Sequence, residues 1–257
     1  MLCGICQEGD PVPGAEPTGT LVIRSEDNGR NWVEAETFKV ITTDPSRGVK
    51  SEQISASFLD VQKDIALLFY SRQFVRDAKF FGGGAMDRKR NIRQYYRISR
   101  DGGKTWEPEQ ALIQKGQDFD ETHWTKGVSY GRNGGKALTY PIQISNGNIL
   151  LPFVMWPYDE ETQELDLHNH MLSGVLIGTW QEDCSGLDWD VGEYIRPKTA
   201  DPEQNNLVEI TVAELNNGSI LGVMRSFSAT WPVKYYSVSK DGGLSWSDAA
   251  PLLFDDG

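Results

Sequence analysis

The chain has 257 residues, of which 39% are hydrophobic and 11% aromatic, so it can bury a sizeable core and is not expected to be disordered. Its formal net charge of −12 argues against nucleic acid and anionic membrane surfaces as partners, although a few convergent arginines can still bind an acidic sugar. No apolar run reaches the roughly 18–20 residues that span a bilayer, and no signal peptide is visible, so the compartment stays unknown.

The three cysteines do not make a metal-ligand set. Cys3 and Cys6 form a C-x-x-C pair near the N-terminus, but neither a second pair nor a following helix accompanies them, and Cys184 is far away in the sequence. His168 and His170 alternate to one face of a strand without a third ligand at a metal-binding spacing. We therefore expect buried strand cysteines, no metal and no other cofactor.

One motif, S-x-D-x-G-x-x-W, occurs three times and follows an alternating strand each time. Its pattern predicts a hairpin turn, because the aspartate can accept hydrogen bonds from N–H groups of the turn and the glycine adopts a positive φ without steric cost. The tryptophan then packs over the turn. The residues with these structural roles are Ser25, Asp27, Gly29, Trp32, Ser99, Asp101, Gly103, Trp106, Ser239, Asp241, Gly243 and Trp246.

The spacing of the copies predicts a fourth, degenerate one. Asp27 and Asp101 are 74 residues apart, whereas Asp101 and Asp241 are 140 residues apart, about two such periods. The intervening copy has one extra residue before its glycine and consists of Asp183, Gly186 and Trp189. We interpret all four aspartates as structural rather than catalytic.

Two Asn-Gly pairs join alternating apolar runs, in residues Ile142–Pro152 and Val212–Gly222, and predict further hairpins. Four strands per repeat make a propeller blade, and no amphipathic helix is visible, so the predicted fold class is an all-β propeller. The longer loops are expected on the ligand-binding face; they are Asp77–Lys89, Gln114–Lys136 and Tyr158–His170.

These repeats resemble the Asp boxes, or BNR repeats, of the sialidase (neuraminidase) superfamily. About four repeats are visible here, against six blades in that family. The resemblance covers residues 1–257, which we expect to form one, partial, sialidase-like propeller domain. It is most specific between Leu207 and Arg225, where Glu209 enters a strand, a hairpin turns at Gly218, and Arg225 leaves the partner strand before the box at Ser239.

The resemblance implies that Glu209 is the base for a tyrosine nucleophile and that Arg225 is one of three arginines that bind the substrate carboxylate. The substrate would be a terminal sialic acid of a glycoconjugate. A tyrosine with an ordinary pKa of about 10 needs a neighbouring carboxylate to take its proton, and an arginine matches a carboxylate with a bidentate fork. The alternative is that Glu209 and Arg225 are solvated residues at a strand end, but their order beside hairpin and box favours the functional interpretation.

The other parts of a sialidase site are harder to assign. The resemblance places the general acid within residues Gln7–Thr20, where Asp10 is the candidate beside Glu8 and Glu16, although the sequence around Asp10 favours an ordinary turn. The first arginine is expected upstream of residue 1, and the third arginine and the tyrosine downstream of Trp246. Both ends therefore look cut, and we expect little or no sialidase activity from the chain alone.

Several other residues have two interpretations, as ligand contacts or as ordinary packing and surface residues. They are the aromatic clusters His123-Trp124 and Trp156-Pro-Tyr158, and the arginines Arg72, Arg76 and Arg132. Three functions stay open: a sialidase-type glycoside hydrolase, a non-catalytic propeller that binds a glycan or a protein, and another glycan-active enzyme on the same propeller.

Overall fold

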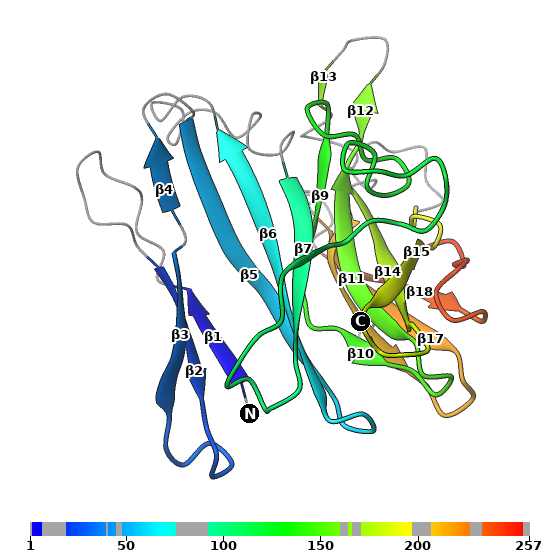
Figure 1. The fold of residues 1–257 in the computed structure, drawn as a ribbon. Helices are drawn as coiled ribbons and strands as arrows, with labels where there is room; N and C mark the ends of the chain where they lie inside the picture. The colour runs from blue at the N-terminus through cyan, green and yellow to red at the C-terminus, as the bar shows by residue number, and fades with distance from the viewer. Residues whose placement is uncertain are drawn as a thin grey trace. The chain divides into compact units, whose positions relative to one another are not determined.

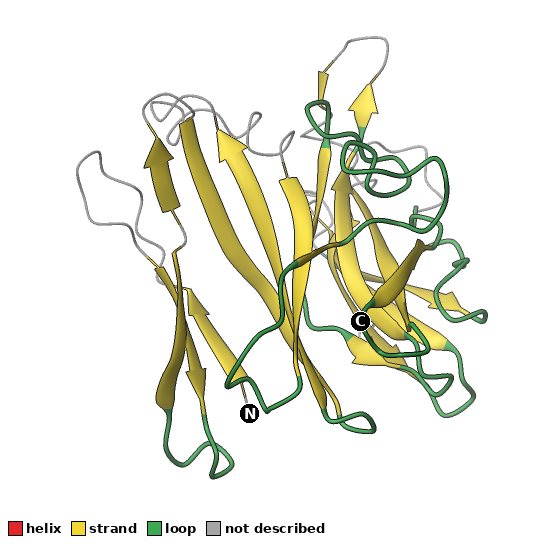
Figure 2. Cartoon of the chain, in the orientation of Figure 1, coloured by secondary structure: helices red, strands yellow, loops and turns green. Residues whose placement is uncertain are grey.

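The computed structural model describes residues 2–6, 19–39, 41–44, 48–75, 92–159, 164–165, 171–196, 207–226 and 233–253. Within these ranges the chain contains 19 β-strands and no helix, which confirms the predicted all-β class (Figure 2). The chain divides into two compact units, Met1–Leu112 and Ile113–Gly257, and each is described by itself.

The first unit contains two antiparallel sheets (Figure 1). The strands of the smaller sheet pair in sequence order and are β1 (Leu2–Cys6), β2 (Gly19–Arg24) and β3 (Val33–Lys39). The strands of the larger sheet also pair in sequence order and are β4 (Ile41–Asp44), β5 (Gly48–Asp60), β6 (Ile65–Val75), β7 (Ile92–Ser99) and β8 (Gln110–Ala111).

Strand β6 is the centre of the larger sheet. Its residues Ile65–Tyr70 are all buried, which explains their continuous apolar run, whereas β7 alternates between buried and half-buried positions. The β5–β6 hairpin is closed by Asp60, whose side-chain Oδ1 accepts the N–H groups of Gln62 and Lys63 at 3.1 Å each. No Asn-Gly pair marks this turn, so the sequence patterns did not reveal it.

The second unit contains two larger sheets and one short ribbon. In the first sheet β11 pairs with β14 on one side, and on its other side with β9 and β10 at opposite halves of its length. The strands of this sheet are β9 (Gly134–Ala137), β10 (Ile142–Gln143), β11 (Ile149–Trp156), β14 (Leu172–Trp180) and β15 (Leu187–Val191). The short ribbon consists of β12 (Tyr158–Asp159) and β13 (Glu164–Leu165).

The second sheet of this unit pairs its strands in sequence order. These strands are β16 (Leu207–Glu214), β17 (Ile220–Ser226), β18 (Lys234–Ser239) and β19 (Ala250–Pro251). Both predicted Asn-Gly hairpins are present, between β10 and β11 and between β16 and β17, and Gly147 and Gly218 adopt φ values of 90° and 79° in them.

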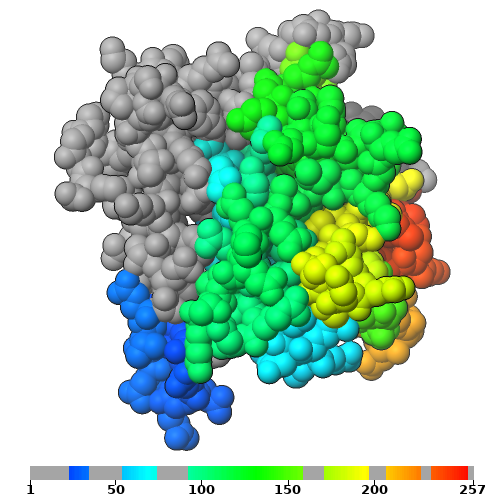
Figure 3. Space-filling model, in the orientation of Figure 1, coloured from blue at the N-terminus to red at the C-terminus, as the bar shows by residue number. Residues whose placement is uncertain are grey.

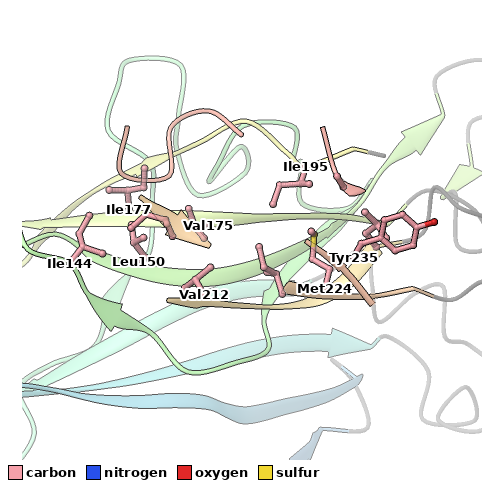
Figure 4. Packing of buried hydrophobic residues seen from close by; sticks show 12 residues of the cluster. Ile144, Leu150, Val175, Ile177, Ile195, Val212, Met224 and Tyr235 are labelled. Atoms are coloured by element: carbon pink, nitrogen blue, oxygen red, sulfur yellow. The ribbon is translucent and has the colours of Figure 1, made fainter. Parts of the chain in front are cut away.

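The core of the second unit lies between its two larger sheets (Figure 4). Leu150 and Val175 from the first sheet are in one buried cluster with Ile210 and Met224 from the second. The backbones also approach closely, since a Cβ atom added to Gly192 would lie 1.9 Å from the carbonyl oxygen of Gly243. The two sheets are therefore packed without room for a side chain at that point.

The second sheet has two distinct ends, because its strands are antiparallel. The β16–β17 hairpin and the turn between β18 and β19 lie at one end, which we name the box end. The start of β16 and the last residues of β17 lie at the other, which we name the open end. The same terms apply to the first sheet, where the β14–β15 turn marks the box end and the last residues of β11 mark the open end.

Candidate functional site

Each of the three regular Asp boxes lies between two paired strands and contains the same hydrogen bonds. In the box at Ser99, the serine Oγ donates to Asp101 Oδ1 at 2.8 Å and accepts the N–H of Gly103 at 2.8 Å. Asp101 Oδ1 also accepts the N–H of Thr105 at 2.9 Å. Equivalent bonds occur in the boxes at Ser25 and Ser239.

The carboxylate of each box aspartate therefore accepts its hydrogen bonds from residues of the same turn. Hydrogen bonds from the Thr105 hydroxyl and N–H hold the pKa of Asp101 well below its ordinary value. In two of the boxes the tryptophan also closes the turn through its indole nitrogen, with Trp32 donating to Gly29 O at 3.0 Å and Trp246 to Gly243 O at 3.2 Å. A carboxylate held in this way is suited to a structural role.

The degenerate fourth copy occupies the turn between β14 and β15 but differs from the other three in geometry. Its positive φ, 57°, falls on Cys184 instead of on Gly186. Asp183 Oδ1 accepts the N–H and hydroxyl of Ser185 at 2.9 and 2.7 Å. Trp189 lies inside strand β15 and is 2% exposed, rather than over the turn. The extra residue before the glycine therefore changes the conformation of the turn, but the turn still joins two paired strands of the sheet.

Glu209 and Arg225 lie together at the open end of the second sheet. The register of β16 against β17 shifts between Val208, which pairs with Arg225, and Thr211, which pairs with Val223. Two residues of β16 thus face one residue of β17, which is the geometry of a β-bulge. Within the bulge Glu209 adopts a φ of 53°, a conformation that is uncommon for a residue other than glycine.

The bulge separates the side chains of neighbouring residues. Ile210 is 1% exposed and belongs to the core cluster, whereas the side chain of Glu209 is about half exposed beside Arg225. Nη1 of Arg225 lies 3.4 Å from both carboxylate oxygens of Glu209. This pair is long and both side chains are about half exposed, so its contribution to stability is small.

The remaining sequence candidates divide into two groups. Asp10, Glu8 and Glu16 lie outside the described residues. Arg76, the histidines at 168 and 170, and the loop from Asp77 to Lys89 lie outside them too.

Arg72 lies in the first unit, where its guanidinium donates to both oxygens of Glu109 at 3.0 and 2.7 Å and lies 4.3 Å from the Tyr95 ring centroid. Arg72 is thus engaged by Glu109 and Tyr95.

The first unit also contains a tyrosine beside a carboxylate, but this pair lacks the properties of a nucleophile and its base. Tyr70 donates a hydrogen bond to Glu109 and is 1% exposed. Burial, followed by the Glu109 carboxylate, raises the pKa of Tyr70 far above its ordinary value. A buried phenol that holds its proton so firmly is suited to packing rather than to attack on a substrate.

The loop between β8 and β9 forms a cavity at the open end of the first sheet of the second unit. In Figure 3 this loop is the green surface beside the yellow segment of β15, to which Gln114 and Lys115 are hydrogen-bonded. The cavity has a volume of about 530 Å³. It is lined by Asp118, Phe119, His123, Thr125, Gly127, Val128, Ser129, Arg132, Asn133, Met155, Pro157, Tyr158, Leu172 and Arg196.

Each of the two predicted aromatic clusters has one member that lines the cavity and one tryptophan that is buried. His123 and Tyr158 line it, whereas Trp124 and Trp156 are 1% and 8% exposed and belong to the packing. Arg132, one of the arginines with two interpretations in the sequence, also lines the cavity and places its guanidinium 5.5 Å from the centroid of the Tyr158 ring. The sequence showed these residue types but not that His123, Arg132 and Tyr158 line one cavity.

Among the described residues, no group of three or more His, Cys, Asp or Glu side chains could hold a metal ion. Within the same ranges, none of the elements is a helix long and apolar enough to cross a membrane.

Antiparallel sheets with an Asp box between their last two strands define an all-β propeller of the sialidase type. The chain belongs to the family of BNR repeat-like domains, which matches residues 14–256. No curated protein sequence matches the chain significantly.

Several solved structures resemble the chain at low identity and support the fold alone. A protein of unknown function from Dyadobacter fermentans is 18% identical, with a TM-score of 0.59 over 94% of this chain and 60% of that one. The intramolecular trans-sialidase from Ruminococcus gnavus, in complex with oseltamivir carboxylate, is 12% identical, with a TM-score of 0.60 over 98% and 67%. An ulvan lyase from a new polysaccharide lyase family is 12% identical, with a TM-score of 0.56 over 98% and 55%. The chain thus spans between 55% and 67% of the length of these proteins.

Proposed function

We propose that the chain, taken as one domain over residues 1–257, is a sialidase-like domain that acts on an acidic sugar at Glu209 and Arg225. The observation that carries this proposal is the bulge that directs Glu209 out of the core and beside Arg225. A positive φ at a non-glycine residue costs roughly 1–2 kcal/mol. Such a cost at a half-exposed glutamate is explained by a function that needs its carboxylate in this place.

The chemistry of the pair fits this role. The Arg225 guanidinium can bind a sugar carboxylate through two parallel hydrogen bonds. The Glu209 carboxylate can accept the proton of a phenol as the phenolic oxygen attacks the anomeric carbon, and a general acid, for which Asp10 is the candidate, protonates the leaving oxygen. Water then releases the sugar from the tyrosyl intermediate. Glu209 and Arg225 are the members of this set that we assign among the described residues.

A second acidic sugar is also compatible with the pair. The ulvan lyase with this fold was also solved bound to a glucuronate–rhamnose sulfate chain. Glucuronate and sialic acid both carry a carboxylate, and Arg225 can bind either. The proposal therefore names a terminal sialic acid of a glycoconjugate as the substrate and a glucuronate-containing chain as the alternative.

The test measures binding and turnover separately, with the purified 257-residue chain. We expect N-acetylneuraminic acid to bind and Arg225→Gln to weaken that binding about tenfold, because a charge-assisted contact is lost. Glu209→Gln is expected to bind about as well as the parent chain and to abolish any hydrolysis of a fluorogenic sialoside. The matched control is Arg100→Gln, which removes another half-exposed arginine, paired with Glu107 at 2.6 Å.

Two results would reject the proposal. One is sialic acid binding that Arg225→Gln leaves unchanged while Arg100→Gln weakens it. The other is turnover that survives Glu209→Gln. If glucuronate chains bind through Arg225 and sialic acid does not, the site stands and the substrate assignment moves to the alternative.

A further inference from the structure

The cavity beside β11 and β14 is held in shape by the protein itself. Asn133 is 2% exposed, and its amide donates to Gly127 O at 2.7 Å and to Trp156 O at 3.0 Å, while its Oδ1 accepts the N–H of Ser129 at 2.7 Å. One buried side chain thus fixes the loop to the end of β11. The loop also closes on itself, since the N–H of Tyr130 donates to Thr122 O at 2.8 Å. A ligand would meet a preformed wall, so little ordering entropy would oppose binding.

The lining combines an apolar floor with aromatic rings. Met155 and Leu172 are 5% and 3% exposed and come from the adjacent strands β11 and β14, and Val128 is 2% exposed. The rings of Phe119 and Tyr158 complete this part of the lining. A volume of about 530 Å³ lies within the usual range of small-molecule sites, and an apolar floor with a few polar groups is their usual construction.

The charged part of the lining is positive, in a chain whose net charge is −12. Arg132 and Arg196 are the arginines among its described residues, Asp118 is the carboxylate, and His123 is a further nitrogen-bearing side chain. The Arg132 guanidinium carbon lies 5.5 Å from the centroid of the Tyr158 ring, within the range of a cation–π contact. A cation beside an aromatic ring is suited to a ligand that has both a carboxylate and an apolar face.

We infer that this cavity is a second carbohydrate site, which binds a pyranose bearing a carboxylate, of the hexuronate type. The sugar's C–H face would pack on the aromatic and apolar lining, and its carboxylate would accept hydrogen bonds from Arg132 and Arg196. This site does not depend on Glu209 or Arg225, which are absent from the lining. It lies at the open end of its own sheet, as Glu209 does in the neighbouring one.

The experiment follows the methyl signal of Met155, because this side chain lines the cavity and the chain has only five methionines. Methyl-¹³C-methionine protein is titrated with methyl glucuronide and, separately, with neutral methyl glucoside. We expect the Met155 signal, assigned with Met155→Leu, to shift with glucuronide, and the affinity to exceed that for the glucoside about tenfold. Arg132→Gln and Arg196→Gln are each expected to weaken glucuronide binding about tenfold.

The control variants separate this site from the one at Arg225. Arg100→Gln should leave the glucuronide affinity that the Met155 signal reports unchanged, and Tyr158→Phe should preserve it because the ring stays in place. An absent Met155 shift, or an equal affinity for glucoside, would overturn the inference. Glucuronide binding that is lost in Arg225→Gln and kept in Arg132→Gln would overturn it too, and would assign the sugar to the Glu209 and Arg225 pair instead.

Discussion

The two ends of the second sheet of the second unit use the same backbone conformation for opposite purposes. At the box end the positive φ values fall on glycines, such as Gly243 at 98°, and the carboxylate of Asp241 is engaged by its own turn. At the open end the positive φ falls on Glu209, at 53°, and the carboxylate is half exposed beside Arg225. One end is stabilised by the hydrogen bonds of its own turn, whereas the other has a strained backbone beside a half-exposed charged pair.

This difference shows which features a sequence pattern can reveal. A box glycine is the residue that the turn conformation favours, so the motif and the geometry agree. Glu209 contradicts the local preference, and such disagreements concentrate at functional sites. We therefore expect substitutions at the box end to change the free energy of unfolding, and substitutions at the open end to change mainly the interaction with a sugar.

The largest effect is expected at Gly243. Its φ of 98° disfavours any side chain, and an added Cβ would lie 2.8 Å from Cγ2 of the fully buried Val175. Gly243→Ala should therefore lower the free energy of unfolding by about 2–4 kcal/mol, which urea denaturation would measure. Gly218→Ala is the matched control, because its φ is 79° but no heavy atom lies within 4 Å of the added Cβ. It should cost only about 1 kcal/mol, and equal losses would contradict the packing argument.

A smaller effect is expected when the box carboxylate is removed. Asp241 Oδ1 accepts hydrogen bonds from the Ser239 hydroxyl at 2.8 Å and from the N–H of Ser245 at 2.9 Å. Asp241→Ala should lower the free energy of unfolding by about 1–2 kcal/mol, because these donors lose their partner. The affinity for N-acetylneuraminic acid should stay the same. A loss of sugar binding at unchanged stability would show that the box takes part in recognition.

The same carboxylate predicts a dependence of stability on pH. Partial burial opposes ionisation of Asp241, but hydrogen bonds from Ser245 and Ser239 outweigh it and hold the pKa below the ordinary value of 3.8. A depressed pKa stabilises the folded state above the unfolded pKa, and this stabilisation disappears as the pH falls through the lower folded value. We expect stability to decrease below about pH 4, and Asp241→Asn to decrease less over that interval. Urea denaturation at pH 7, 4 and 3 would compare them, and parallel losses would contradict the assignment.

Much of the fold was predictable from the sequence. Three regular boxes and two Asn-Gly turns are local signals, because turn chemistry depends on neighbouring residues. The degenerate copy at Asp183 was placed in the correct turn, but its conformation was not predictable, because the extra residue transfers the positive φ to Cys184. The Asp60 turn was missed because a single capping aspartate gives no distinctive pattern.

The candidate site was less predictable, because its geometry depends on features that leave no local sequence pattern. The order of Glu209 and Arg225 predicted that they lie together, and the structure places them 3.4 Å apart. The bulge that achieves this left no sign in the sequence, because Glu209 is not a residue that favours it. The cavity arises from a long loop whose shape depends on the burial of Asn133, a tertiary contact that no local pattern encodes.

The smallest expected effect has the opposite sign. Glu209→Gly should raise the free energy of unfolding by about 0.5–1 kcal/mol, because glycine adopts a positive φ without strain. The greater conformational entropy of glycine in the unfolded chain offsets only part of this stabilisation. The lost ion pair with Arg225 matters little, since it is long and half exposed. The same variant should lose any turnover of a sialoside. Urea denaturation and the sialoside assay together decide the matter: a clear destabilisation by Glu209→Gly would mean that the Glu209 side chain serves the fold, and the case for a strained functional residue would fail.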